Sequence, residues 1–444
     1  MTAPHHHRPA EDGPTSPSAP MSPSGQTNPS GQTNPSRPTS PSGLAGPTRR
    51  TLLTGAAATA SLAVSDMATG TAPAHADRAE PVPSSLRPGG EFDAYVARLA
   101  QADQFSGTVL LRHRSRPVLA RSYGMADKAR SIPNGPDTIF KLASVSKCLT
   151  AVALGQLVQR DKVDLHAPLG DYLDGFSAET AKVTVHHLLT HTAGLGEYAQ
   201  SPEYRQGLKE WASERELMDG VLALIRKQET APAFTPGTRH VYSNSGYFVL
   251  GAVVAAASGV PYHDYVRAHV IAAAGMRRSG LYTRPQVLES REIAHPYWTQ
   301  QSGERADFTT SEFFGHVGGP ADGVYACAPD LLAFVDALTR GRLLSPAYAS
   351  AFTSGKVLLS PADRPVVPAD ARFYGYGFRD TVTGGHRTWG HSGSAVGVAA
   401  NLDVFPGLDW AVVVLSNYDN PITPIVLKAR ELITRSAPLA TEGG

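Results

Sequence analysis

The apolar and polar positions at the start of the folded part predict a helix followed by two strands. Apolar residues recur at helical spacing from Phe92 to Leu99, so we expect an amphipathic helix over residues 91–102. Residues 106–126 hold two apolar runs separated by a polar turn, which is the pattern of a β-hairpin. The folded chain is therefore expected to open in the order helix, strand, strand.

The middle of the chain repeats apolar residues at helical spacing, with connections that are rich in Pro and Gly. We expect helices over residues 144–159, 184–195, 214–228, 244–259, 262–275 and 329–341. After about residue 370 the pattern becomes that of strands, and a last helix follows. These strands are expected over residues 373–382, 387–393, 395–406 and 408–417, and the helix over residues 421–436.

This order of elements predicts a mixed fold of the α/β (α+β) class. The two β-rich ends are expected to pair into one antiparallel sheet flanked by helices. We assign the sheet part to about residues 85–143 and 371–436, and a mostly helical inserted domain to about residues 144–370. Together they form a domain over residues 77–444, which is long enough for one large unit or two interlocked ones.

The segment that precedes this domain has a different composition. Residues 1–47 are dominated by Pro, Ser, Thr and Gly and contain the hexapeptide PSGQTN twice, at 23–28 and 29–34. Such a segment has almost no apolar surface to bury, so we expect it to be a disordered region of low complexity.

Residues 48–76 carry the features of an export signal. The pair Arg49-Arg50 comes directly before an uncharged, mildly apolar run, residues 51–65, which is too short to span a bilayer. Small residues at Ala74 and Ala76 suit signal peptidase. We therefore expect a twin-arginine signal peptide, cleavage before Asp77, and a secreted protein.

Charge and cysteine content narrow the classes of partner. The formal net charge of +1 gives no electrostatic argument for nucleic acid or for an anionic membrane. No apolar tail follows the last helix, so we expect a monomer without a membrane anchor after signal cleavage. The two cysteines, Cys148 and Cys327, are predicted to be buried thiols, with a disulfide between them as the alternative.

The segment KLASVSKCLT contains a serine and a lysine three positions apart. On a helix Ser144 and Lys147 would share one face, where the lysine amine could reach the serine hydroxyl. Ser146 lies in the same segment but would point to a different face. By itself the pair is also compatible with one turn of an ordinary amphipathic helix.

Two more polar clusters occur later in the chain. The segment VYSNSGY places Tyr242 and Asn244 just before an apolar helix, and TWGHSGSAVG places His391 and Gly393 on a predicted strand. Taken alone, Asn244 could be a helix N-cap, and His391 could be a core histidine or part of a turn.

In the order S-x-x-K, Y-x-N and H-x-G, these motifs together resemble the serine β-lactamase and penicillin-recognising superfamily. Within it they are similar to the group that holds class C β-lactamases, D-Ala-D-Ala carboxypeptidases and related esterases and amidases. The flanking segments FSGTVLL, LLTHTAGL and PGTRHVYSNSGY agree, and the resemblance covers about residues 85–435. It implies a β-lactamase-like fold.

The resemblance also implies catalytic roles. Ser144 would be the acylated nucleophile, activated by Lys147 as its base. Tyr242 would share the proton with Lys147 and deliver it to the leaving group. The backbone N–H groups of Ser144 and Ser394 would form the oxyanion hole.

Further residues are implied to bind the substrate. Asn244 would hold the substrate amide and Lys147 in register, while His391 and Ser392 would contact the substrate and Gly393 would let its backbone lie close to the strand. Arg379 lies ahead of His391, where carboxypeptidases of this group carry an arginine that binds the terminal carboxylate of the peptide.

No cofactor and no metal are implied by this resemblance. His187 and His191 have zinc-ligand spacing, but the glutamate of H-E-x-x-H is replaced by Leu188. The third motif reads H-S-G where class C β-lactamases carry K-T-G, which favours the carboxypeptidase branch or its esterase-like relatives.

We therefore expect an exported serine hydrolase that forms an acyl-enzyme at Ser144, with D-alanyl-D-alanine carboxypeptidase action on cell-wall peptides as the first interpretation. The alternative is an esterase, amidase or β-lactamase-type hydrolase that acts on small esters, D-amino-acid amides or β-lactams. A penicillin-binding protein that is acylated without turnover is the second alternative.

Overall fold

The computed structural model describes residues 82–228, 231–360 and 369–436. The predicted low-complexity region and signal peptide, residues 1–76, lie outside the described residues. The domain boundaries at residues 47 and 77 therefore stay predictions.

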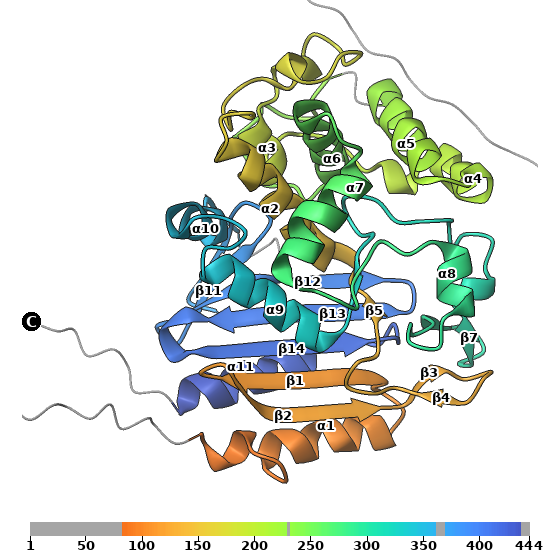
Figure 1. Cartoon of the computed structure of the whole chain (residues 1–444), viewed down its shortest axis with the longest axis vertical. Helices are drawn as coiled ribbons and strands as arrows, with labels where there is room; N and C mark the ends of the chain where they lie inside the picture. Colours follow the sequence, from red (N-terminus) through yellow and green to blue (C-terminus); the bar gives the residue numbers. More distant parts are fainter. Residues whose placement is uncertain (1–81, 229–230, 361–368, 437–444) are drawn as a thin grey trace, which may run out of the picture. The chain divides into compact units, whose positions relative to one another are not determined.

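The described fold is built on an eight-stranded antiparallel sheet that joins the two ends of the domain (Figure 1). Strand β1 (Gly107–His113) lies between its hairpin partner β2 (Arg116–Tyr123) and β14 (Trp410–Ser416), which comes from the far end of the chain. The order continues from β14 through β13 (Val398–Phe405), β12 (His386–Ala395), β11 (Arg379–Thr383), β10 (Ala371–Tyr374) and β9 (Val357–Leu358). The predicted pairing of the β-rich ends is confirmed.

The central strands are apolar on both sides because both faces of the sheet are covered. In β14, Val412 and Val414 pack into one cluster with helices α1 (Glu91–Gln101) and α11 (Thr423–Arg435). Val413 belongs to the larger cluster on the opposite face, which also holds the core of the helical part. A continuous apolar run is typical of a strand that is buried on both faces.

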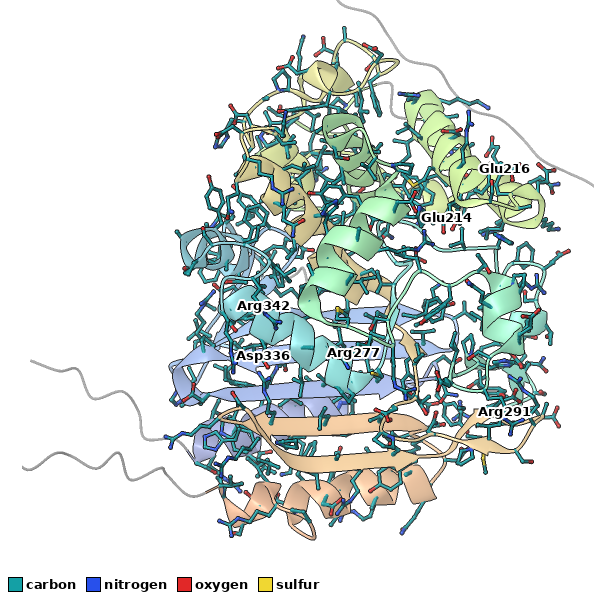
Figure 2. The ribbon with its side chains drawn as sticks, viewed as in Figure 1. Glu214, Glu216, Arg277, Arg291, Asp336 and Arg342 are labelled. Atoms are coloured by element: carbon teal, nitrogen blue, oxygen red, sulfur yellow. The ribbon has the colours of Figure 1, made fainter. Side chains whose placement is uncertain are left out.

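Helix α9 (Ala328–Thr339) covers the second face of the sheet and corrects the predicted domain boundary. It packs on β1 and β14, and it carries Asp336, which is labelled in Figure 2. Asp336 forms an ion pair of 2.9 Å with Arg112 of β1. The sequence assigned residues 144–370 to a helical insert, but α9 and the edge strand β9 within this range belong to the layers of the sheet. Helical periodicity identified the helix without showing what it packs against.

The helical part lies around α2 (Ser146–Val158) and α6 (Asn244–Ser258), which pack against each other. Its other helices are α3 (Val185–Leu189), α4 (Pro202–Glu210), α5 (Glu214–Gln228), α7 (Tyr262–Val266), a π-helical turn (Arg267–Ala272), α8 (Arg284–Glu289) and α10 (Pro346–Thr353). Three short ladders pair β3 (Met125–Asp127) with β4 (Ile132–Pro133), β5 (Phe140–Lys141) with β8 (Tyr325–Ala326), and β6 (Tyr297–Thr299) with β7 (Arg305–Asp307).

One predicted helix is much shorter than expected. The sequence predicted helix over residues 184–195, but α3 ends at Leu189. His191 and Gly194 follow with φ of +58° and +77°, in the left-handed region that cannot continue a right-handed helix. The apolar pattern continues past this break because the loop itself is buried.

Both cysteines are buried free thiols, as predicted. Cys148 lies inside α2, where burial raises the pKa of its thiol. Cys327 is the residue that precedes α9, and burial raises its pKa to about 11. Neither thiol is therefore a good source of thiolate at neutral pH.

Within the described part of the chain, no single helix is long and apolar enough to cross a membrane. Among the described residues, α6 and residues 262–272 form one bent pair of helices that together have the length and apolar composition of a membrane span.

Candidate active site

The predicted nucleophile stands on a tight turn between β5 and α2. Ser144 lies in a 3-10 turn, Ala143–Val145, and α2 begins only at Ser146, so the predicted helix start at residue 144 is two residues early. Ala143 has φ of +45°, which is unfavourable for a residue with a side chain. Strain of this kind concentrates at functional sites, where the surrounding fold holds it in place.

Lys147 is fully buried, and its amine is directed by three hydrogen bonds. Nζ lies 3.2 Å from Ser144 Oγ, 2.6 Å from Asn244 Oδ1 and 2.9 Å from the carbonyl oxygen of Ala321. The structure thus brings the first and second motifs into direct contact. In its neutral form, the amine is close enough to accept the Ser144 proton directly.

Asn244 reaches Lys147 because Ser243 takes the capping role at the start of α6. Ser243 Oγ accepts a hydrogen bond from the N–H of Gly246, so the alternative of Asn244 as the N-cap is wrong. The side chain of Asn244 is therefore available to the site. Its amide nitrogen donates to Glu197 at 2.8 Å, which turns Oδ1 toward Lys147.

Glu197 was not identified from the sequence. Its Oε2 atom accepts from both the backbone N–H and the side-chain amide of Asn244, at 3.0 and 2.8 Å. Glu197 directly follows the segment LLTHTAGLG, and no motif joins it to residue 244. Its position just after a segment that the resemblance already covers was the one available signal.

Tyr242 faces the same site with its hydroxyl group unengaged. Its Oη is buried and has no hydrogen-bond partner among the described residues. The Lys147 amine lies 5.0 Å from the centre of the Tyr242 ring. No hydrogen bond from a described residue therefore competes for this hydroxyl, which agrees with the proton-transfer role that the resemblance implies.

His191 packs against Tyr242 as a neutral ring. The two ring centroids are 4.2 Å apart, and His191 Nδ1 accepts a hydrogen bond from the N–H of Ser243 at 3.1 Å. Burial, with a further contribution from nearby Lys147, holds the pKa of His191 well below its usual value. His187 instead closes the first turn of α3 through Thr184, so the two histidines with zinc-like spacing have separate structural partners.

His391 lies on the side of β12 that faces this cluster. Its Nδ1 donates to the carbonyl oxygen of Ser392 at 2.6 Å, because a carbonyl can only accept, and its Nε2 pairs with the hydroxyl of Tyr374 at 3.0 Å. Burial raises the pKa of Tyr374 well above its usual value, so this hydroxyl keeps its proton beside the imidazole.

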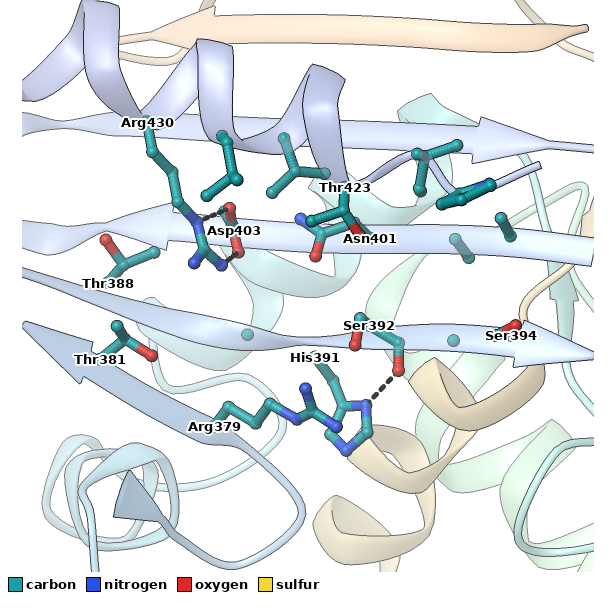
Figure 3. Close-up of a pocket in the computed structure, with 18 of the residues that line it drawn as sticks. Arg379, Thr381, Thr388, His391, Ser392, Ser394, Asn401, Asp403, Thr423 and Arg430 are labelled. Carbon is teal, nitrogen blue, oxygen red and sulfur yellow. Dashed lines mark hydrogen bonds and ion pairs between the residues drawn. The ribbon is translucent and has the colours of Figure 1, made fainter. Parts of the chain in front are cut away.

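Ser392 lies on the opposite face of β12 from His391. It is paired with Asn401 of β13, and both side chains face the α11 side of the sheet (Figure 3). Successive side chains on a strand alternate between faces, so Ser392 does not join His391 in contacting a substrate at Ser144. The predicted substrate-binding role of Ser392 has no geometric support.

Gly393 makes room for the nucleophile turn rather than for the substrate. A Cβ atom at this position would lie 2.1 Å from the carbonyl oxygen of Leu142 and 3.0 Å from the backbone nitrogen of Ser144. The strand therefore passes directly beside the turn that carries Ser144. Ser394 follows on the same strand, so the predicted oxyanion hole draws its two N–H groups from neighbouring backbones.

Arg379 and His391 line the same cavity of about 350 Å³. Arg379 is the first residue of β11 and is paired with Gly390, and Figure 3 shows its side chain extending toward His391. Among the described strands, β12 beyond Gly390 pairs only with β13. An extended substrate can therefore lie along this open edge, with Arg379 at one end of it.

The sequence matches known proteins over the whole of this architecture. A family model described as Beta-lactamase matches residues 92–433. The chain is similar to Esterase EstB of Burkholderia gladioli, with 31% identity over 273 residues that cover 56% of this chain and 69% of the esterase. It is also similar to the teichoic acid D-alanine hydrolase of Staphylococcus aureus, with 26% identity over 170 residues, 38% of this chain and 39% of that protein.

Solved structures show the same fold. The penicillin binding protein from Bacillus halodurans superposes with a TM-score of 0.65 and 28% identity, covering 76% of this chain and 98% of that one. The alignments with the curated relatives cover between 39% and 69% of the relatives' own lengths. Each relative is therefore longer than the part that this chain matches. The residues matched by the family model include all three motifs.

Proposed function

Because this chain belongs to the Beta-lactamase family and is a serine hydrolase of that family, we propose that it acts as a D-alanyl-D-alanine carboxypeptidase. Ser144 would be acylated by a cell-wall peptide, and the terminal residue would leave. The observation that carries this proposal is the arginine at the open edge of β12: Arg379 is paired with Gly390, and its side chain extends toward His391 (Figure 3), which suits a substrate with a free carboxylate.

Acylation would begin at the contact between Ser144 and Lys147. Ser144 Oγ attacks the carbonyl carbon of the substrate while its proton passes to the neutral Lys147 amine, 3.2 Å away. The oxygen of the substrate takes the negative charge between the N–H groups of Ser144 and Ser394. The C–N bond then breaks, and the leaving amine takes a proton from Tyr242, which regains one from Lys147.

Deacylation would reverse these transfers with water in place of the amine. Water occupies the position of the leaving group and attacks the ester carbon, while its proton passes to the neutral Lys147 amine, either directly or through Tyr242, which accepts it as its own proton moves to Lys147. The bond from carbon to Ser144 Oγ breaks, and the serine oxygen recovers its proton from Lys147. The unengaged hydroxyl of Tyr242 supports this step, since no described residue competes for it.

The charge of Arg379 supports a carboxylate on the leaving group. A guanidinium can bind a carboxylate with two parallel hydrogen bonds, which fixes both position and orientation. Tyr242 and His391 have ring centroids 6.3 Å apart, so the group that would protonate the leaving amine lies at the same end of the site. The leaving group and its carboxylate would thus both lie toward Arg379.

An esterase or amidase is the second candidate. The relative with 31% identity is named an esterase, and another relative is named for removing D-alanine from teichoic acid. The same acylation and deacylation would cleave an ester, with an alcohol in place of the amine. This candidate requires no carboxylate on the leaving group, and that difference separates it from the first.

The test combines intact mass with product analysis. The protein of residues 77–444 and its Ser144→Ala variant would be incubated with benzylpenicillin and, separately, with a diacylated L-Lys-D-Ala-D-Ala tripeptide. We expect a mass gain with benzylpenicillin and release of free D-alanine, both lost in the variant. Release of D-alanine at the level of the variant, together with hydrolysis of simple esters, would overturn the carboxypeptidase proposal in favour of the esterase.

A further inference from the structure

A second cavity, of about 320 Å³, lies at the other end of the open edge of β12. Its lining includes Ala395 and Val396, which follow Ser394, and Lys141, which is three residues before Ser144. It also includes Asp322, the neighbour of the Ala321 carbonyl that binds Lys147. The cavity therefore adjoins the nucleophile from three separate segments.

The geometry of the site decides which part of a substrate would enter this cavity. The scissile carbonyl lies at Ser144, and the leaving group lies on the side of Tyr242 and His391, whose ring centroids are 6.3 Å apart. The acyl group must leave the carbonyl carbon in the opposite direction, along β12 toward Ala395. That direction leads into the second cavity.

The walls of this cavity are rich in aromatic rings. Three of its ring pairs meet edge to face, with centroid separations of 5.4, 5.9 and 6.0 Å and interplanar angles of 70°, 76° and 85°. These pairs are Tyr198 with Phe248, Tyr282 with Tyr325, and Phe308 with Phe314. Rings arranged in this way present both faces and edges, which favour the entry of another aromatic ring.

The size and charge of the cavity agree with such an occupant. An apolar cavity of about 150 Å³ is large enough to bind benzene, and this one is about 320 Å³. Among its charged side chains, Lys141 and Asp322 form an ion pair of 3.5 Å whose charges offset each other, and Arg284 donates to the carbonyl oxygen of Thr309 at 2.9 Å. The lining thus offers apolar surface for a ring and no net charge from this pair.

We infer that this cavity is the acyl-group pocket of the enzyme and that it takes an acyl group bearing an aromatic ring. The preferred substrates are then esters, amides or peptides whose acyl side is an arylalkyl group. The inference rests on the proposed function, because it assumes that Ser144 is acylated. It concerns the acyl side of the substrate alone, whereas the carboxypeptidase proposal concerns the leaving group.

Four synthetic esters test the acyl-group pocket and the carboxypeptidase proposal separately. Acetyl and phenylacetyl esters of D-lactate would each be compared with the same ester of methyl D-lactate, and kcat/KM would be corrected for the alkaline hydrolysis rate of each compound. We expect the phenylacetyl esters to be about tenfold or more better than the acetyl esters, since a buried ring removes a large apolar area from water. The contribution of the carboxylate is measured by comparing each ester of D-lactate with the same ester of methyl D-lactate.

Two matched variants assign the acyl preference to this cavity. Val396→Trp places a large side chain at its rim, where Val396 is 44% exposed, and Leu288→Trp places the same side chain on α8, where Leu288 is 41% exposed. Val396→Trp is expected to reduce the preference for phenylacetyl over acetyl esters to about twofold or less. Leu288→Trp is expected to leave the preference unchanged.

The possible results lead to different conclusions. Equal kcat/KM for acetyl and phenylacetyl esters would overturn the inference, whether or not a free carboxylate raises kcat/KM. A phenylacetyl preference that Val396→Trp leaves intact would also overturn it, because the ring would then bind elsewhere. A preference for phenylacetyl without any preference for the free carboxylate would support the inference and contradict the carboxypeptidase proposal.

Discussion

Glu197 controls the orientation of Asn244, and through it the position of the Lys147 amine. Replacing Glu197 by Gln keeps the shape but loses the charge and allows an N–H group to face the Asn244 donors. We expect kcat to fall about tenfold or more with a small change in KM, because Asn244 would no longer hold the Lys147 amine toward Ser144. The free energy of unfolding is expected to fall by no more than the roughly 1.5–3 kcal/mol that a hydrogen bond to a charged group contributes. Steady-state kinetics and thermal unfolding would measure this.

Glu203→Gln is the matched control for this prediction. Glu203 lies on α4, where its carboxylate is an exposed partner of Lys227 at 3.8 Å. The control is expected to leave both kinetic constants unchanged. If Glu197→Gln lowered kcat only in proportion to the fraction of protein that is unfolded, the role of the carboxylate would be purely structural.

His191 gives the folded protein a pH-dependent stability of known sign. Its pKa is lowered in the folded state, so below about pH 6.5 the unfolded chain takes up a proton that the folded chain does not. The stability that the neutral ring contributes is therefore present above about pH 6.5 and is lost as the pH falls below it. The loss is about 1.4 kcal/mol per pH unit until the folded ring titrates.

His191→Asn tests this sign, because Asn can accept the hydrogen bond from Ser243 and tolerates the φ of +58°. We expect the difference in free energy of unfolding between pH 7.5 and 5.5 to be about 1 kcal/mol smaller in the variant. Urea unfolding at the two pH values measures it, with the half-buried His386→Asn as the control. Identical pH dependence in the variant and the wild type would contradict the assignment.

Ser144 and Lys147 could be paired from the sequence because they are only three positions apart. The structure brings their side chains to 3.2 Å, although Ser144 lies in the 3-10 turn before α2 and not in the helix itself. Their supporting groups could not be predicted in the same way, since Glu197 binds Asn244 across 47 residues and the Ala321 carbonyl binds Lys147 across 174. Only the folded chain brings such groups together.

On the scale of elements, the close approach of β12 to the turn of Ser144 depends on Gly393. A methyl group there would meet the Leu142 carbonyl and the Ser144 nitrogen, so Gly393→Ala must push the strand and the turn apart. We expect kcat/KM to fall about 100-fold or more, because one displaced oxyanion donor costs about that much. The rate of acylation by benzylpenicillin, followed by intact mass, measures the loss.

Gly407→Ala is the control for this change, since a Cβ at Gly407 would meet no atom within 4 Å. It lies in the short turn between β13 and β14 and is expected to leave acylation unchanged. Normal acylation of Gly393→Ala would show that the strand can move without cost to the oxyanion hole.

The elements with strong periodicity were predicted best. The helix expected over residues 214–228 matches α5, because its apolar residues recur regularly and polar residues separate them. The helix expected over residues 184–195 was too long, because a buried loop is also apolar. Apolar residues in the sequence indicate that a segment is buried. They do not show whether the segment is a helix or a loop, which depends on the backbone dihedral angles of the folded chain.

On the scale of the whole molecule, the pairing of the chain ends was predicted correctly, and the boundary of the insert was not. Alternating strands at both ends have few places to bury their apolar faces, so one shared sheet was the simplest solution. The place of α9 against β1 and β14 depends on packing between distant segments. Its sequence is compatible with either domain.

Export through the twin-arginine route remains a proposal that the whole precursor can test. We expect the secreted protein to begin at Asp77, and the double replacement of Arg49 and Arg50 by Lys to leave uncleaved precursor inside the cell. N-terminal sequencing of the secreted protein and immunoblotting of cell fractions measure both results. Unchanged secretion of the double variant would contradict the proposed route.

The pairing of β1 with β14 has a consequence for the order in which the enzyme matures. Gly107 is matched with Ser416, so this pair of strands cannot form until the chain has been synthesised through β14. Contacts between such distant segments make folding slow and leave the nascent chain without its central layer. The strand that carries His391 and Gly393 is supported by β13 and β14, so we expect a fragment that ends before β14 to lack the support that holds this strand against the turn of Ser144.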